Sequence, residues 1–138
     1  MGAGRLDLLL LWHMHQPDYR DHARGEPALP WVYLHAIKDY TDMAAHLERH
    51  PGIRATVNFV PVLLDQLEDY ASQLRRNDLR DPLLRLLGHP DLDRIGAAER
   101  KLLLDSCFRS NHLTMVTPFA PYERLHEIIR MLKGEDEV

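Results

Sequence analysis

The sequence predicts an α/β fold that opens with the first β/α units of a TIM-like barrel. Two strand patterns, each followed by a helical pattern, occupy the N-terminal half of the chain. The first strand runs directly into a cluster of polar residues, which is how α/β enzymes build active sites. A closed barrel takes about 250 residues, whereas this chain has 138. We therefore expect the opening piece of a catalytic domain, truncated before the barrel closes.

Residues 6–12 are predicted to form a central parallel strand. Nearly all of their side chains are apolar, as expected when both faces of a strand are covered. Residues 18–30 are predicted to form a long loop, because they are polar, carry Gly25, Pro27 and Pro30, and show no period. Loops of this length inside compact domains are often functional.

A helix is predicted to begin at Trp31 and to end before Pro51-Gly52. Apolar residues recur in it at spacings of three and four: Tyr33, Ile37, Tyr40, Ala44 and Leu47. Residues 53–60 alternate between apolar and polar side chains, which predicts a second strand. Pro61 suits the first position of a second helix, because its missing N–H is not needed there. The apolar stripe of this second helix is Leu63, Leu64, Leu67, Tyr70 and Leu74.

These patterns divide the chain into two parts. Residues 1–76 are expected to form two β/α units with parallel strands, and residues 77–138 to be helical. Helices are expected at 82–87, 97–108 and 122–132, and no third strand is convincing. The acidic tail at 134–138 is expected to pack against nothing, so that the polypeptide stops in the middle of its architecture.

The composition is that of a globular protein, with 45% hydrophobic residues, 28% charged residues and a formal net charge of -4. Basic residues form no stripe, which argues against nucleic acid as a partner. The N-terminal apolar segment is too short to span a membrane. Cys107 is the only cysteine, which excludes an internal disulfide, and its helical apolar surroundings predict a buried structural thiol. We expect a cytoplasmic protein.

Two histidines at the end of the first strand are the strongest candidates for a binding site. His13 and His15 alternate with Met14, so they point to the same side of the strand. At the C-terminal end of a barrel strand, that side faces the mouth of the barrel. Imidazoles donate and accept hydrogen bonds there, and Gln16 adds a carboxamide whose direction Pro17 fixes.

Aromatic and polar residues of the following elements are expected near the same mouth. Trp31 lies where the long loop meets the helix, and a half-exposed indole there offers the kind of face on which sugar rings stack. Ordinary core packing explains Trp31 equally well. His35 lies one turn further, on the side of the helix that carries Asp39, and a surface role for it remains open. Asn58 ends the second strand on its polar side and is a further candidate.

Several catalytic signatures are missing from the sequence. It contains no glycine-rich phosphate loop, no Gly-X-Ser-X-Gly elbow and no His-Glu-X-X-His helix. Glycoside hydrolysis needs two carboxyl groups that face each other across a cleft. No Asp or Glu is expected at a strand end with such a partner, so no catalytic residue is predicted within the chain.

The sequence nevertheless resembles glycoside hydrolase family 57 in four ordered segments. His15-Gln16-Pro17 after an apolar strand resembles the first signature region of that family. Residues 29–40 and 57–67 strengthen the match, and residues 111–125 resemble the helical insertion of the family. His-Gln-Pro alone is a weak signal, whereas the ordered set over most of the chain is fairly specific.

The resemblance implies an incomplete (β/α)7 barrel with a helical insertion and retaining chemistry on α-glucans, without a metal or other cofactor. It implies an amylase, a 4-α-glucanotransferase or a branching enzyme, with His13 and His15 lining the subsite of the cleaved sugar and Trp31 and His35 nearby. The nucleophile Glu and the acid Asp of the family lie on later strands, which this sequence does not reach. The chain alone is therefore predicted to be inactive and to self-associate through exposed barrel edges.

Two other functions stay open at this point. His13-X-His15 at the end of a first barrel strand also resembles the zinc or iron ligands of metal-dependent hydrolases. Gln16-Pro17 and residues 29–40 are not required for such a site, and metal analysis would separate the two hypotheses. A complete, non-enzymatic α/β interaction module is the third hypothesis, and it predicts a monomer that unfolds cooperatively.

Overall fold

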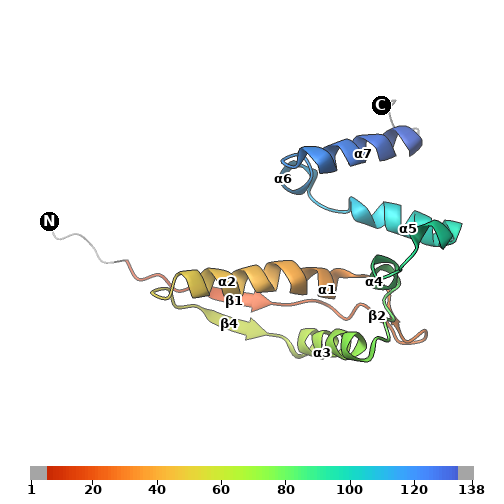
Figure 1. The fold of residues 1–138 in the computed structure, drawn as a ribbon. Helices are drawn as coiled ribbons and strands as arrows, with labels where there is room; N and C mark the ends of the chain where they lie inside the picture. The colour runs from red at the N-terminus through yellow and green to blue at the C-terminus, as the bar shows by residue number, and fades with distance from the viewer. Residues whose placement is uncertain (1–5, 134–138) are drawn as a thin grey trace. The chain divides into compact units, whose positions relative to one another are not determined.

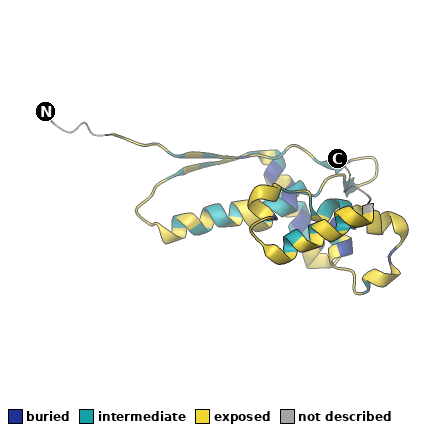
Figure 2. Ribbon diagram, turned by 90° about the horizontal axis from the view of Figure 1, so that it is seen from above, coloured by how far each residue is buried: buried dark blue, intermediate teal, exposed yellow. Residues whose placement is uncertain are grey.

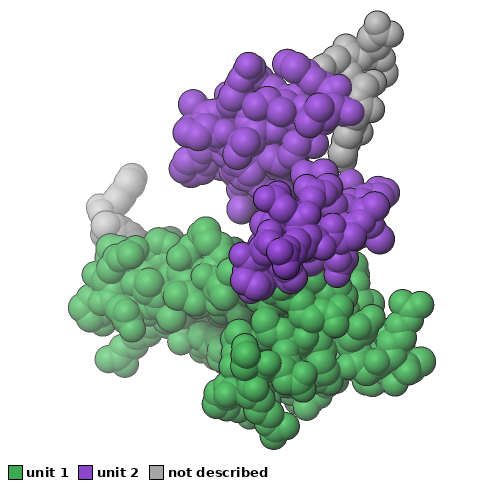
Figure 3. Space-filling view, turned by 45° about the vertical axis from the view of Figure 1, so that its right-hand side comes forward, with its two compact units in different colours: residues 1–85 green, residues 86–138 purple. Residues whose placement is uncertain are grey.

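The computed structural model describes residues 6–133 and separates into two compact units, Met1–Arg85 (unit 1) and Leu86–Val138 (unit 2) (Figure 3). The acidic tail at 134–138, expected to pack against nothing, lies outside the described residues. None of the helices within residues 6–133 has the length and apolar character needed to cross a bilayer.

Unit 1 is built on a pair of parallel strands, β1 (Leu11–Met14) and β4 (Thr56–Phe59) (Figure 1). Leu11 lies opposite Thr56 and His13 lies opposite Asn58. A long helical segment connects the two strands, and α3 (Pro61–Arg76) follows β4. Each strand is thus followed by a helix, as the sequence predicts, and the fold is mixed α/β.

The first strand differs from the prediction of residues 6–12. β1 begins at Leu11 and ends at Met14, while Leu6, Leu8 and Leu9 are 89%, 77% and 91% exposed. The reason is the length of the partner strand, because β4 begins only at Thr56, whose N–H donates to the carbonyl of Leu10. Upstream of that bond, no strand of the described residues pairs with this segment. The expectation of self-association through such edges stays a prediction.

The segment predicted as a structureless loop contains a small hairpin. β2 (Arg20–Asp21) pairs antiparallel with β3 (Glu26–Pro27). Gly25 closes the turn at a φ of 70°, in the region that favours glycine, and its N–H donates to the carbonyl of Asp21 over 2.8 Å. Strands of two residues carry too little periodicity to be read from sequence.

The hairpin is tied to α3 by Arg20. Its guanidinium donates to both Asp18 oxygens, over 2.8 and 2.9 Å, and to Asp65 Oδ2 over 2.6 Å. The side-chain and backbone hydrogen bonds from Arg20 hold the pKa of Asp18 well below its ordinary value. The side-chain hydrogen bonds to Asp18 and Asp65 raise the pKa of Arg20.

Asp18→Asn is expected to make the free energy of unfolding less dependent on pH in the acidic range. A carboxyl whose folded pKa is depressed stabilises the fold above its unfolded pKa of about 4, and this contribution is lost as the pH falls toward the lowered value. Urea unfolding of the two proteins should therefore differ most at neutral pH and converge on acidification. A difference that stays constant with pH would contradict this role for Asp18.

The helical segment after Trp31 is not one regular helix. It consists of α1 (Trp31–His35), a π-helical turn (Ala36–Tyr40) and α2 (Thr41–Arg49). The Thr41 hydroxyl donates to the carbonyl of Ala36, five residues back, over 2.8 Å. A π turn rotates the residues after it relative to those before it, and such turns occur frequently at functional sites.

Burial in unit 1 is greatest where α1 and α3 contact each other, while the strand pair is mostly half-buried or exposed (Figure 2). The buried apolar residues of the unit are Met14, Val32, Tyr33, Leu63, Tyr70 and Leu83. The buried side of α3 follows Leu63, Gln66, Tyr70 and Gln73. The predicted stripe was wrong in part, because Leu64 and Leu74 are 44% and 59% exposed while the two glutamines are each 2% exposed.

Asp81 is a buried carboxylate that begins α4 (Pro82–Leu87). It accepts hydrogen bonds from the Tyr70 hydroxyl over 2.6 Å and from the backbone N–H of Leu84 over 2.9 Å. Burial, with the Asp81 bond and charge, raises the pKa of Tyr70. Burial and the Asp81 charge raise the pKa of Tyr33 as well, and its ring lies 5.5 Å from that of Tyr70.

The described residues of unit 2 form helices and no strand. These helices are a 3₁₀ turn (Leu92–Arg94), α5 (Ala97–Cys107), α6 (His112–Met115) and α7 (Ala120–Lys133). The ring of Phe108 stacks on Tyr122 at 4.8 Å, joining the end of α5 to α7. Cys107 corrects the prediction of a buried thiol: it is exposed, although partial burial raises its pKa.

Candidate functional site

The two histidines lie at the carboxyl end of β1, with their rings stacked on each other. The ring centroids of His13 and His15 are 5.7 Å apart and their planes differ by 16°. Both residues are exposed, whereas Met14 between them is only 5% exposed. The two imidazoles therefore share one face of the strand, as the alternation of the sequence predicts.

Asn58 fixes the orientation of His13. Its Oδ1 lies 2.6 Å from Nδ1 of His13, because the parallel register places the two residues opposite each other. An amide oxygen only accepts hydrogen bonds, so the neutral His13 ring carries its proton on Nδ1. Nε2 is then left with its lone pair as an acceptor for a hydroxyl donor.

The carboxamide of Gln16 is held by two tyrosines. Its oxygen accepts a hydrogen bond from the Tyr19 hydroxyl over 3.0 Å, and its Nε2 donates to the Tyr40 hydroxyl over 3.4 Å. The Tyr40 hydroxyl in turn lies 3.5 Å from the carbonyl of His15 as a donor. Gln16 is half-buried within these bonds, so it supports the chain beside His15 and keeps one N–H for another partner.

Trp31 and His35 form a second aromatic group. Their ring centroids are 6.4 Å apart, and the His35 ring lies 6.3 Å from that of Tyr40. The π turn accounts for the second contact, since it brings positions five residues apart closer to one face than a regular helix does. Nδ1 of His35 contacts the carboxylate of Asp39, one turn further. Trp31 is half-buried.

Five of the six residues predicted from sequence thus fall into two groups joined through Tyr40, and the sixth, Asn58, contacts His13. His13 lies in β1 and His15 and Gln16 follow it, while Trp31 and His35 lie in α1. The sequence pattern places Tyr40 only in an apolar stripe and does not point to Tyr19 or Gln66. The signal that could have identified Gln66 is its position on the side of an amphipathic helix that is buried. Nothing in the sequence singled out Tyr19.

Carboxylates near this site are already bound to other groups. Asp18 and Asp65 bind Arg20, and Asp39 contacts His35. Within residues 6–133, no Asp or Glu occurs in β1, in β4 or among the three residues after each strand. These residues hold no group of three or more His, Cys, Asp or Glu placed to bind a metal. The described cluster is equipped to bind hydroxyl groups and ring faces.

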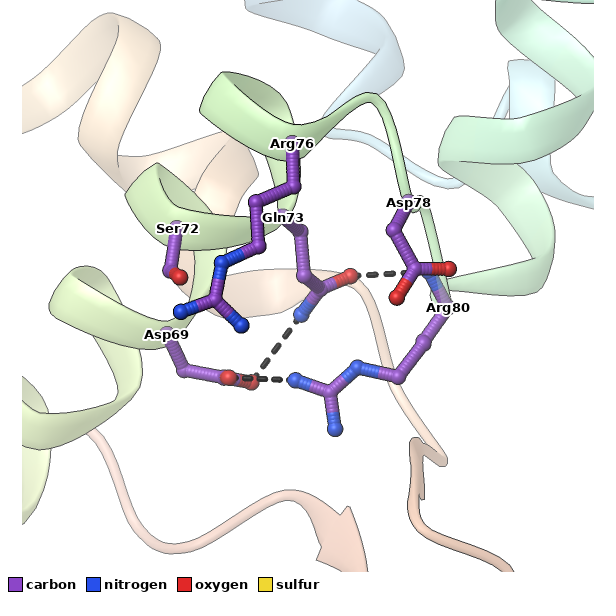
Figure 4. A pocket seen from close by; sticks show the side chains of 6 residues that line it. All are labelled: Asp69, Ser72, Gln73, Arg76, Asp78 and Arg80. Atoms are coloured by element: carbon purple, nitrogen blue, oxygen red, sulfur yellow. Dashed lines mark hydrogen bonds and ion pairs between the residues drawn. The ribbon is translucent and has the colours of Figure 1, made fainter.

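Two hollows of unit 1 lie elsewhere. One, of about 310 Å³, is lined by Asp69, Ser72, Gln73, Arg76, Asp78 and Arg80 (Figure 4). A second, of about 220 Å³, shares Asp69 and Arg80 and extends along the hairpin. Asp69 pairs with Arg80 and accepts a hydrogen bond from Gln73 over 2.9 Å, so much of the polar lining is satisfied internally. Neither hollow includes His13 or His15.

Comparison with curated proteins and with solved structures finds no match. The family model described as glycosyl hydrolase family 57 matches residues 9–129, which is most of the chain. The matched range contains the His13–His15 pair, all four strands, and α3 through most of α7. The chain belongs to glycosyl hydrolase family 57.

Proposed function

We propose that this chain forms the N-terminal part of an α-glucan-active, retaining glycoside hydrolase or glucanotransferase, and that it supplies residues of a sugar subsite. Membership of the family supports glycoside hydrolase chemistry in general. The observation that carries the finer proposal is the exposed, stacked His13–His15 pair at the carboxyl end of a parallel strand. Exposed imidazoles in fixed orientation suit a ligand rich in hydroxyl groups.

Each residue of the cluster has a separate role in this proposal. Nε2 of His13 accepts a hydrogen bond from a sugar hydroxyl, because Asn58 occupies Nδ1. His15 binds a neighbouring hydroxyl, and Gln16 offers its remaining N–H. The half-buried indole of Trp31 packs against the apolar face of a sugar ring, with His35 beside it.

We further propose that the nucleophile and the acid/base lie outside residues 6–133, on later strands of an incomplete barrel. Two observations support this. Asp18, Asp39 and Asp65 are paired with Arg20 or His35, and no Asp or Glu lies within three residues after β1 or β4. Retaining glycosidases need two carboxyl groups about 5 Å apart. The purified chain should therefore bind an α-glucan without cleaving or transferring it.

Binding and turnover are tested together on the purified chain of 138 residues. Its migration in a native gel that contains amylopectin should be retarded, whereas a gel with the β-linked galactomannan should have no effect. Reducing-end assays with maltoheptaose should detect no new ends, and chromatography should detect no longer or shorter chains. Equal migration in both gels would contradict the sugar subsite, and measurable turnover would contradict the placement of the reacting carboxyls.

A further inference from the structure

Gln66 is a buried amide whose three hydrogen bonds leave it a single orientation. It lies on the buried side of α3 and is 2% exposed. Its Nε2 donates to the carbonyl of Pro17 over 2.9 Å and to that of Val62 over 3.0 Å, while its oxygen accepts from the N–H of Tyr19 over 3.0 Å. A flipped amide would set its oxygen against two carbonyls, so burial makes any other orientation costly.

These bonds hold the chain immediately after the histidine pair. Pro17 and Tyr19 flank Asp18, and both are fixed through their backbone atoms. Tyr19 in turn orients Gln16, because its hydroxyl donates to the Gln16 oxygen over 3.0 Å. Gln16 then reaches the Tyr40 hydroxyl, which lies 3.5 Å from the carbonyl of His15. A continuous series of hydrogen bonds thus connects α3 to the backbone of His15.

We propose that Gln66 is a positioning residue of the sugar subsite, acting through Pro17 and Tyr19 on the orientation of Gln16 and His15. The other tether of this segment to α3, the Arg20–Asp65 pair, is more exposed, with 64% of the Asp65 side chain accessible. Exposed ion pairs contribute little fixed geometry. That Gln66 influences sugar binding rests on the proposed function, whereas its control of the His15 geometry does not.

Gln73 provides a matched control on the same helix. It is also 2% exposed and lies two turns further along α3. Its carboxamide donates to Asp69 over 2.9 Å and accepts from the N–H of Arg80 over 2.8 Å, so it holds the start of α4 and not the segment after β1. Loss of either amide removes buried hydrogen bonds of the same kind, and only one of them supports the histidines.

The test compares Gln66→Met and Gln73→Met in the full chain, since Met keeps the side-chain volume and removes the amide. Histidine-ring NMR, the exchange rate of the Tyr19 amide and a maltoheptaose titration are measured for both, with urea unfolding to match their stability. Gln66→Met should shift the His15 ring signals, speed Tyr19 exchange and weaken maltoheptaose binding about tenfold. Gln73→Met should change none of the three at a similar loss of stability.

Equal effects of both variants, or unchanged His15 signals in Gln66→Met, would overturn the proposal. If the parent chain does not bind maltoheptaose, the proposed function fails, while the ring signals and Tyr19 exchange still decide the positioning role. If Gln66→Met does not fold, Tyr19→Phe removes the next bond of the series without touching a fully buried residue. It should then shift the side-chain amide signals of Gln16 and the ring of His15, and unchanged signals would again overturn the proposal.

Discussion

Asp81→Ala is expected to lower the free energy of unfolding of unit 1 by about 3 kcal/mol. Two losses add up in this variant. The N-terminus of α4 loses the acceptor of its Leu84 N–H, and the buried Tyr70 hydroxyl loses its partner. Urea unfolding followed by tryptophan fluorescence measures the effect, because both tryptophans, Trp12 and Trp31, belong to unit 1.

Tyr70→Phe is the control that separates these two losses. It removes only the phenolic oxygen and should cost about 1 kcal/mol. The double variant Tyr70→Phe/Asp81→Ala should be more stable than the sum of the single changes implies, since no hydroxyl is left unpaired. A loss of less than about 0.5 kcal/mol for Asp81→Ala, typical of a surface change, would show that the carboxylate stabilises neither partner.

His15→Ala should weaken binding of maltoheptaose to the chain about tenfold, equivalent to roughly 1.4 kcal/mol. The ring is exposed and stacks only on His13 among the contacts described, so the variant should fold with a stability change within about 0.5 kcal/mol. Isothermal titration measures the affinity. His46→Ala on α2 is the matched control, because it removes another exposed imidazole of unit 1 away from β1.

Equal affinities of His15→Ala and His46→Ala would remove His15 from the sugar subsite. In a longer enzyme that also holds the reacting carboxyls, the same change should lower mainly kcat. The contact would then be one that strengthens in the transition state. A raised KM at constant kcat would instead indicate uniform binding of substrate and transition state.

The order of the elements followed from sequence because it depends on local patterns. The apolar run, the alternation at 53–60 and Pro61 predicted two strands with a helix after each, and these elements are present. The limits of β1 did not follow, since strand ends depend on where the partner strand lies. The π turn at Ala36–Tyr40 and the two-residue strands of the hairpin leave too little periodicity to be recognised.

The sequence predicted residues of the candidate site but not the hydrogen bonds that connect them. His13 and His15 were found because alternation along a strand fixes which side chains share a face. Gln66 was overlooked because the apolar count favoured Leu64 and Leu67 on α3, whereas the buried position belongs to an amide satisfied by the loop. Long-range hydrogen bonds of this kind depend on the path of the chain, which no local pattern records.

The central claim is that the imidazoles of His13 and His15 form part of a sugar subsite, and histidine-ring NMR during a maltoheptaose titration tests it most directly. The account predicts that the ring signals of His13, His15 and His35 move together with the Trp31 indole signal, and that His22 and His46 stay unchanged. If no ring signal moves, or if only that of His22 in the hollow shared by Asp69 and Arg80 moves, the claim is contradicted.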